Sequence, residues 1–227
     1  MLGTIVNSGA IIAGSLVGLI FKGRIKENYT DTIMKGLALC VMLIGLMNAM
    51  KVDNMLLLIF SIVIGCVLGE AMNIEGKLEA LGHALERKFE GSDHSIAKGF
   101  VTASLLFCVG SMAIIGSIES GLTGNHQTLF AKSILDGITS IIFSTTLGLG
   151  VAFSAAAVFV YQGIITICAG LLKDVLTTAT IMDISSVGGV LIIALGFNVL
   201  EVSKIKVGNM LPAILVPFLY HIILNFF

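Results

Sequence analysis

The sequence predicts an all-α integral membrane protein with about eight transmembrane helices. An inverted repeat of spans 1–3 and 6–8 is expected to flank a central two-helix hairpin. Of the 227 residues, 56% are hydrophobic and only 12% are charged, whereas soluble domains carry about 25% charged residues. This amount of charge is too small to cover a globular surface in water, and lipid must therefore cover most of the surface. The spans must be helical because an isolated strand in lipid would leave its backbone polar groups unpaired.

Eight segments have the length and composition of a membrane span, because a bilayer core of about 30 Å needs roughly 20 apolar residues of helix. The predicted spans are residues 2–21, 33–50, 54–72, 99–119, 127–148, 152–172, 183–202 and 209–226. The chain is thus interpreted as a single transmembrane domain over 1–227. Within it, repeat one covers 2–72, the central hairpin covers 99–148 and repeat two covers 152–226.

Lysine and arginine residues divide unevenly between the two sides of the predicted membrane. Ten lie on one side, and three (Lys51, Lys132 and Lys173) lie on the other. Positive charge is retained in the cytoplasm, so we expect a multi-pass protein of the bacterial cytoplasmic (inner) membrane with both termini outside. Between spans three and four, apolar residues recur at helical spacing. They predict an amphipathic helix over 74–90 on the cytoplasmic face.

The first and last three spans correspond weakly in sequence. Because two spans separate the copies, the second copy runs in the opposite direction through the membrane. Inverted repeats are common in secondary transporters, whose substrate sites lie near the midplane at the repeat interface, and they also occur in channels. The matching positions, in order along the chain, are Gly9 with Gly163, Gly45 with Gly196, Asn48 with Asn198, and Asn54 with Asn209.

The fifth span carries a polar stripe in the stretch "KSILDGITSIIFS". Ser133, Asp136, Ser140 and Ser144 are spaced by three or four residues, so they share one helix face. Asp136 lies about eight residues into the span, roughly 12 Å deep and near the midplane. A carboxylate with nearby hydroxyls suits Na⁺ or a proton. Alternatively, Lys132 neutralises Asp136 at i, i+4 and the hydroxyls only allow close packing. We expect Lys132 to reach the outer interface as a boundary charge.

Five further residues are candidates for an ion or substrate path. Ser111 falls near the midplane of span four, and Glu119 falls near its outer mouth, where a wetted helix end is an equal interpretation. Asn48, Asn198 and Gln162 are polar amides inside apolar spans. They would line the path, or else form interhelical hydrogen bonds.

Enzyme, nucleic-acid and metal functions find little support. There is no H-E-x-x-H pair and no glycine-rich phosphate loop, so we predict that the protein is not an enzyme. A net charge of −1 gives no reason to expect a nucleic-acid partner. Cys40, Cys66, Cys108 and Cys168 lie in apolar runs without metal-ligand spacing. The expected cofactors are therefore none, with Na⁺ or H⁺ as the coupling ion.

Two stretches resemble a known family. They are "GTIVNSGAIIAGSLVG" at the beginning and "FCVGSMAIIGSIESGLTGNHQTLFAKSILDGITSIIFSTTLGLGV" across spans four and five. Both are similar to the bacterial membrane proteins filed as domain of unknown function 554, over essentially the whole chain. The resemblance implies a polytopic inner-membrane protein of about this length with a transport role. It assigns no substrate and no site residue.

These observations predict a membrane transport protein, an ion-coupled (Na⁺ or H⁺) secondary transporter of a small solute or ion, with Asp136 as the principal site. One alternative is a cation channel whose pore is lined by the span-five polar face. Another is a non-transporting membrane scaffold or sensor that signals through the amphipathic helix. The expected partners are the lipid bilayer and the small solute or ion. At 23.8 kDa the chain is small for a carrier, which favours a homodimer.

Overall fold

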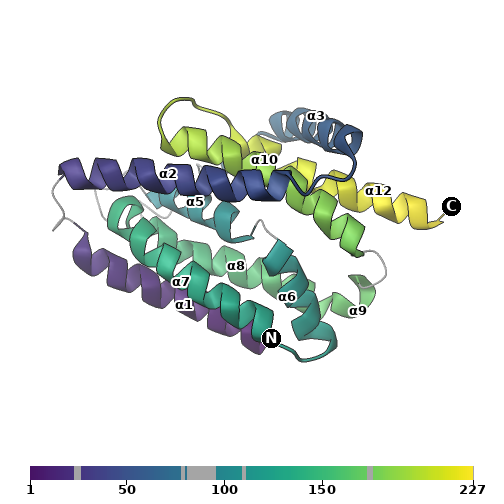
Figure 1. Ribbon diagram of the computed structural model, residues 1–227, viewed down its shortest axis with the longest axis horizontal. Helices are drawn as coiled ribbons and strands as arrows, with labels where there is room; N and C mark the ends of the chain where they lie inside the picture. The colour runs from purple at the N-terminus through teal and green to yellow at the C-terminus, as the bar shows by residue number, and fades with distance from the viewer. Residues whose placement is uncertain (23–26, 78–79, 81–95, 109–110, 173–175, 227) are drawn as a thin grey trace. The chain divides into compact units, whose positions relative to one another are not determined.

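The computed structural model describes residues 1–22, 27–77, 80, 96–108, 111–172 and 176–226, and within these ranges the chain forms helices and no strand (Figure 1). The all-α prediction is confirmed for this part of the chain. The elements are α1 (Leu2–Phe21), α2 (Glu27–Ala49), α3 (Met55–Met72), α5 (Ile96–Cys108), α6 (Ser111–Leu122), α7 (Gln127–Leu147), α8 (Gly150–Ile167), α9 (Ala169–Leu172), α10 (Thr178–Val199), α11 (Val207–Met210), η1 (Leu211–Ile214) and α12 (Leu215–Phe226).

Six stretches of the described chain are long and apolar enough to cross a membrane. They are α1, α2 from Asp31, α3, α8, α10 and the run Val207–Leu224 through α11, η1 and α12. Helices α5 and α6 would add a seventh span as a bent pair, with an angle of 61° between them. Helix α7 has 21 residues, but its lysine, aspartate and hydroxyl side chains make it more polar than these six. The chain is therefore a multi-span membrane protein.

Two predicted spans differ from the helices of the structure, and one predicted helix cannot be compared with it. The predicted fourth span, 99–119, is two helices, α5 and α6, rather than one. The predicted seventh span, 183–202, begins five residues earlier, because the side chain of Thr177 caps α10 by accepting a hydrogen bond from the Thr180 amide. The predicted amphipathic helix over 74–90 lies mostly outside the described residues, which include only 74–77 and 80 of it.

The chain divides into two compact units. Unit 1 contains α1, α5, α7, α8 and α6 from Met112 onward, and unit 2 contains α2 from Ile33 onward together with α3, α10, α11, η1 and α12. Each unit thus combines helices from the N-terminal and C-terminal parts of the sequence.

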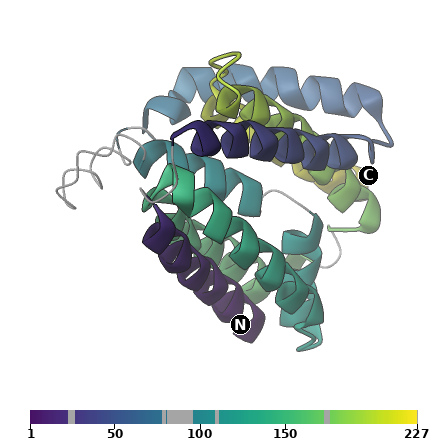
Figure 2. The ribbon, with the colours of Figure 1, turned by 60° about the vertical axis from the view of Figure 1, so that its left-hand side comes forward.

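In unit 1, α1 and α7 lie side by side and run parallel (Figure 2). Their contact follows glycines: a Cβ on Gly3 would meet Leu129, one on Gly14 would meet the Gly137 carbonyl oxygen, and one on Gly18 would meet that of Ile141. Along this contact the residue numbers of α1 and α7 rise together, so the two helices run parallel. The small residues let the two backbones approach closely, as is usual between membrane helices.

Helix α8 packs against both α1 and α5 in unit 1. The hydroxyl oxygens of Thr4 and Thr166 lie 3.5 Å apart, so the N-terminal end of α1 meets the C-terminal end of α8 and the two helices are antiparallel. At the other end of α8, Gly150 lies against the Ile96 carbonyl at the start of α5.

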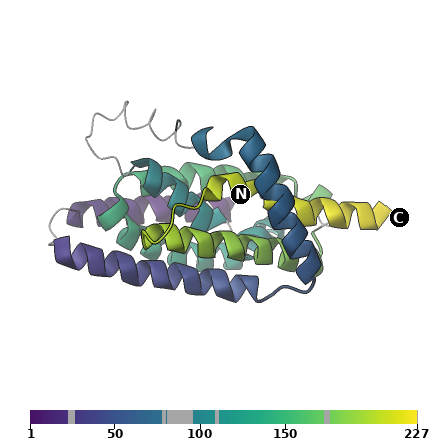
Figure 3. The ribbon, with the colours of Figure 1, turned by 90° about the horizontal axis from the view of Figure 1, so that it is seen from above.

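In unit 2, α2 packs against α10 and α3 packs against the C-terminal segment (Figure 3). A Cβ on Gly45 would lie 2.8 Å from the Gly189 carbonyl oxygen, and one on Gly196 would lie 3.3 Å from the Ala38 carbonyl oxygen. Along this contact the residue numbers of α2 rise while those of α10 fall, so this pair is antiparallel.

A polar clasp joins the C-terminal end of α3 to the start of α11. Glu70 accepts hydrogen bonds from Lys206 Nζ at 2.6 Å and from Asn209 Nδ2 at 2.5 Å. The backbone N–H of Glu75 donates to Asn209 Oδ1 at 2.7 Å. Asn209, one of the repeat-matched asparagines, is 3% exposed, and its side-chain amide is satisfied at both atoms.

Candidate functional site

The polar stripe of α7 faces the interior of unit 1. Ser133, Asp136, Ser140 and Ser144 are each buried, while the opposite face, with residues such as Ile134, is exposed. The helical spacing of the stripe explains this division, because residues three or four apart lie on the same side of a helix. Asp136 is near the middle of the 21-residue helix, so its carboxylate lies far from either end.

Asp136 is held by an ion pair and an amide. Lys132 Nζ lies 2.9 Å from Asp136 Oδ1 and 2.7 Å from Oδ2. Asn7 Nδ2, on α1, donates to Oδ2 at 3.0 Å. The prediction that Lys132 reaches the outer interface is wrong, because this side chain is only 7% exposed. The alternative, neutralisation of Asp136 at i, i+4, describes the observed contact.

Unsatisfied polar atoms gather on the helices around this ion pair. Asn7 Oδ1 has no hydrogen-bond partner among the described residues, and neither does Nε2 or Oε1 of Gln162 on α8. Both side chains are 0% exposed. Each lies about one turn inward from the contact of Thr4 with Thr166, and because α1 and α8 are antiparallel, this places the two amides at the same level.

The two predicted serine ligands of α7 behave differently. Ser133 Oγ donates to the Leu129 carbonyl oxygen at 2.6 Å, a bond within its own helix. Ser140 Oγ is 0% exposed and has no partner among the described residues. Ser111 is the first residue of α6, and its side chain lies outside the described part of the structure.

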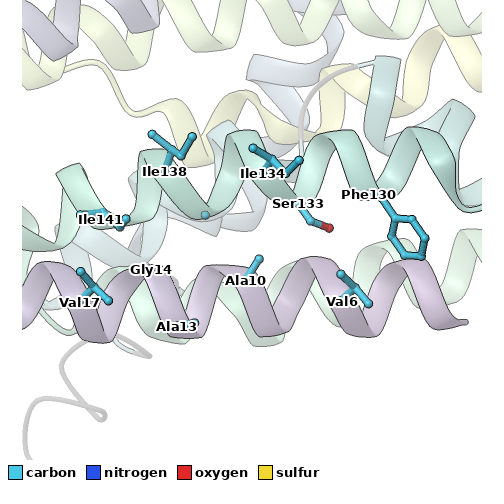
Figure 4. Close-up of a pocket in the computed structure, with 11 residues that line it drawn as sticks. Val6, Ala10, Ala13, Gly14, Val17, Phe130, Ser133, Ile134, Ile138 and Ile141 are labelled. Atoms are coloured by element: carbon cyan, nitrogen blue, oxygen red, sulfur yellow. The ribbon is translucent and has the colours of Figure 1, made fainter.

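An open groove of about 580 Å³ runs along the seam between α1 and α7 (Figure 4). Ser133 is the single polar side chain among its lining residues, which otherwise include Val6, Ala10, Ile134 and Ile138. Neither member of the ion pair lines it. An apolar groove of this kind suits contact with hydrocarbon, and we do not assign the ion or solute path to it.

Glu119 lies in the last turn of α6, in unit 1. Its Oε2 accepts a hydrogen bond from Thr128 Oγ1 at 2.7 Å. The contact connects the end of one helix to the beginning of the next. Glu119 therefore stabilises the turn between these helices. Its partner Thr128 is in the first turn of α7, eight residues before Asp136.

Asn48 and Asn198 belong to unit 2 and lie at opposite ends of the antiparallel pair of α2 and α10. Asn48 Oδ1 accepts from Lys51 Nζ at 3.0 Å. Asn198 makes two hydrogen bonds with the backbone of Ile205. Its Nδ2 donates to the Ile205 carbonyl oxygen at 2.7 Å, and its Oδ1 accepts from the Ile205 N–H at 2.8 Å. Asn198 thus closes the loop after α10, and the structure does not bring the two asparagines together.

A second buried carboxylate was missed by the sequence interpretation. Asp183, on α10, is 6% exposed, and its Oδ2 lies 2.8 Å from His221 Nε2 on α12. The predicted start of span seven at 183 made Asp183 a boundary residue. The cap at Thr177 was the signal that α10 begins earlier. Within the described residues no group of three His, Cys, Asp or Glu side chains could hold a metal ion.

The fold and the buried charges define a polytopic α-helical membrane protein with ionisable side chains inside its helical core. The chain belongs to the family described as protein of unknown function DUF554, which matches residues 2–222, in agreement with the resemblance noted from the sequence.

Two curated relatives match almost the whole chain. It is 39% identical over 222 residues to the uncharacterized membrane protein YdfK of Bacillus subtilis (strain 168), covering 96% of this chain and 94% of that protein. It is 27% identical over 220 residues to the uncharacterized protein YqgA of Escherichia coli (strain K12), covering 95% and 94%. No solved structure matches the chain.

Proposed function

We propose that this protein is a secondary transporter that moves a small solute or ion across the bacterial cytoplasmic membrane, with Asp136 at the centre of its site. The observation that carries the proposal is the buried pair of Lys132 and Asp136 with Asn7 hydrogen-bonded to it. Among the described residues, Asn7 Oδ1 and both amide atoms of Gln162 on α8 have no partner. Ionisable groups inside membrane helices are costly and mark ion and substrate pathways.

The unpartnered amide atoms support the binding of a polar ligand at this site. Buried polar groups in native proteins nearly always have a hydrogen-bond partner, and each unpaired group costs about 1–3 kcal/mol. Asn7 offers one free acceptor, and Gln162 offers an acceptor and a donor group, all at zero exposure. Water or a small polar solute at this level would satisfy them. Ser140 adds a hydroxyl on the neighbouring helix.

The geometry favours a proton over Na⁺ as the coupling ion. Both oxygens of Asp136 are already in contact with the ammonium group of Lys132. A sodium ion would have to displace that ammonium, leaving it unpaired in the helical core. A proton on the carboxylate needs no coordination shell, and it would weaken the attraction to Lys132. The released ammonium could then contact a solute.

The eight-span topology and the inverted repeat are part of this proposal. The six apolar spans and the bent pair of α5 and α6 give seven. Helix α7 follows α1 in parallel along nearly its full length, so a membrane that contains α1 also contains α7, which makes eight. An inverted repeat would also account for the antiparallel contacts of α1 with α8 and of α2 with α10.

The repeat would place the site close to its symmetry axis. The sequence offset that matches Gly9 to Gly163 also matches Asn7 to Tyr161 and Ser8 to Gln162. The antiparallel register set by Thr4 and Thr166 brings those same levels of α1 and α8 together. Transporters with inverted repeats bind substrate at the repeat interface near the midplane, so this position supports a transport function.

Solute-driven proton uptake into proteoliposomes tests the proposal. Vesicles containing the full chain and the pH dye pyranine would be challenged with a panel of amino acids, monocarboxylates and monovalent cations. We expect saturable acidification with at least one class, and Asp136→Asn should abolish it. Asp53→Asn is the matched control, because Asp53 is exposed in the turn after α2 and its removal should leave the rate unchanged.

The same vesicles separate the alternatives. A channel would give unitary currents without saturation, and a scaffold would give neither currents nor flux. If Asp136→Asn retained the wild-type rate and pH dependence, Asp136 could not be the coupling site.

A further inference from the structure

Unit 2 contains its own buried acid–base pair, which is independent of the site in unit 1. Asp183 lies in the second turn of α10, and His221 lies in the second half of α12. The imidazole Nε2 is 2.8 Å from the carboxylate Oδ2, and the side chains are 18% and 8% exposed, respectively. Both residues fall within candidate membrane spans, Thr178–Val199 and Val207–Leu224.

The carboxylate depends on this one partner. Among the described residues, His221 makes the only hydrogen bond to Asp183. A carboxylate in a membrane helix is unfavourable unless it is paired, and a buried ion pair that loses one charge is strongly destabilised. Asp183 is therefore more stable beside an imidazolium, or with a proton of its own, than as a carboxylate beside a neutral imidazole. In both cases the pair carries one proton more than a carboxylate next to a neutral imidazole.

The partner of Asp183 is a histidine rather than a lysine or an arginine. Lysine and arginine keep their charge at physiological pH, whereas histidine is the side chain that gains and loses a proton between about pH 5 and 8. A static ion pair would be served equally well by lysine, as the pair of Lys132 and Asp136 in unit 1 illustrates.

The packed elements bring few other charges to the pair. On α12 the neighbouring group is Tyr220, whose ring lies edge-on to His221 at 5.4 Å. On α3 the acidic residue is Glu70, which lies at the opposite end of that helix, and η1 has no ionisable side chain. The antiparallel register of α2 and α10 places Lys51 and Asp53, after the end of α2, nearest to the level of Asp183.

Three further charged residues lie on α2 itself. These are Glu27, Asp31 and Lys35, in the N-terminal half of the helix. Because the register places Ala38 against Gly196, they lie toward the other end of α10 from Asp183.

The pair also lies near one end of each of its two helices. Asp183 is five residues from the start of α10, and His221 is five residues from the end of α12. At about 1.5 Å per residue, each is roughly 8 Å from the end of its helix. The imidazole is the more exposed of the two side chains, at 18% against 8%, so a proton would reach the pair through it.

We propose that Asp183 and His221 form a proton-binding site of unit 2 that exchanges one proton with water on the face where α12 ends. On binding, the proton adds to the imidazole, and the resulting imidazolium donates its Nε2–H to Asp183 Oδ2. On release, the proton leaves to water and the imidazole returns to its neutral form.

Proton uptake by the purified full chain tests this site. Protein in detergent micelles would be shifted from about pH 9 to about pH 5 in weak buffer, and bound protons counted with an indicator dye. We expect His221→Gln to bind about one proton fewer per chain than the wild type. Asp183→Asn should lose about the same proton, because the imidazole no longer has its carboxylate. The double variant should lose no more than either single variant.

Asp183→Glu keeps the carboxylate and should keep the proton, which separates proton binding from a general loss of structure. Monodisperse elution at both pH values checks the fold, and if Asp183→Asn does not elute as one species, His221→Gln and Asp183→Glu decide. Wild-type uptake in His221→Gln, or in a folded Asp183→Asn, would overturn the proposal. So would a full second proton lost in the double variant.

Discussion

Replacing Lys132 with methionine removes the ammonium group next to Asp136 while keeping a side chain of similar length. The structure gives the size of the expected effect. Nζ lies 2.7 Å from Asp136 Oδ2, and at an effective dielectric constant of about 20, unit charges at that distance attract by about 6 kcal/mol. Desolvation offsets part of this energy, and removing one partner of a buried pair costs about 3–5 kcal/mol in measured cases.

The informative measurement is a double-mutant cycle. Lys132→Met leaves a buried carboxylate whose remaining hydrogen-bond partner, among the described residues, is Asn7. Asp136→Asn leaves a buried ammonium without its counter-charge. We expect each single variant to lower the free energy of unfolding by about 3–5 kcal/mol, whereas the double variant should recover most of the loss, because replacing both charges of a buried pair is often neutral.

Reversible unfolding by SDS in mixed micelles, followed by circular dichroism, would provide the free energies. Lys51→Met is the matched control, because Lys51 is exposed and its ammonium donates to the neighbouring Asn48. We expect a change within about 0.5 kcal/mol. Additive effects of Lys132→Met and Asp136→Asn, to within about 0.5 kcal/mol, would refute the inference that the two charges form a coupled pair.

Two further stability predictions use the same measurement. Gly14→Ala places a methyl group against the Gly137 carbonyl oxygen and should destabilise by about 1–3 kcal/mol, whereas Gly9→Ala meets nothing within 4 Å and should be neutral or slightly stabilising; equal losses in both would contradict the close approach of α1 and α7. Asn198→Ala removes both hydrogen bonds to the backbone of Ile205 and should cost about 1–3 kcal/mol, and an unchanged unfolding curve would show that the loop closure contributes nothing.

Local spacing predicted the polar face of α7 because it depends on one helix alone. The steps between Ser133, Asp136 and Ser140 fix a common side, and the structure buries that side. The contact of Lys132 with Asp136 is also local, at i, i+4, and the sequence contained it as an alternative. Two considerations weigh against it in the sequence: a lysine placed before an aspartate is the weaker orientation of such a pair, and a lysine near a span end can reach water. Inside a bundle, the nearby carboxylate is the better partner.

The remaining site contacts could not be predicted because they join distant segments. Asn7 and Asp136 are separated by 129 residues, and only the parallel packing of α1 against α7 brings them together. The pair of Asp183 and His221 was missed for a different reason. Apolar composition defined the predicted spans, so a charged residue such as Asp183 was placed at a span boundary. A hydroxyl cap at Thr177 and an uncharged first turn allow α10 to begin before Asp183.

The ion pairs of the two buried carboxylates differ in how they respond to movement between helices. Lys132 and Asp136 belong to one helix, so their contact survives any rigid movement of α7. Asp183 and His221 belong to different helices, so their contact changes whenever α10 and α12 separate. In unit 1 the bond that is sensitive to movement is therefore the one from Asn7 on α1 to Asp136. A shift of α1 along α7 would break that bond first and leave the ion pair intact. It would also free the Asn7 amide, whose oxygen already lacks a partner, to bind a solute.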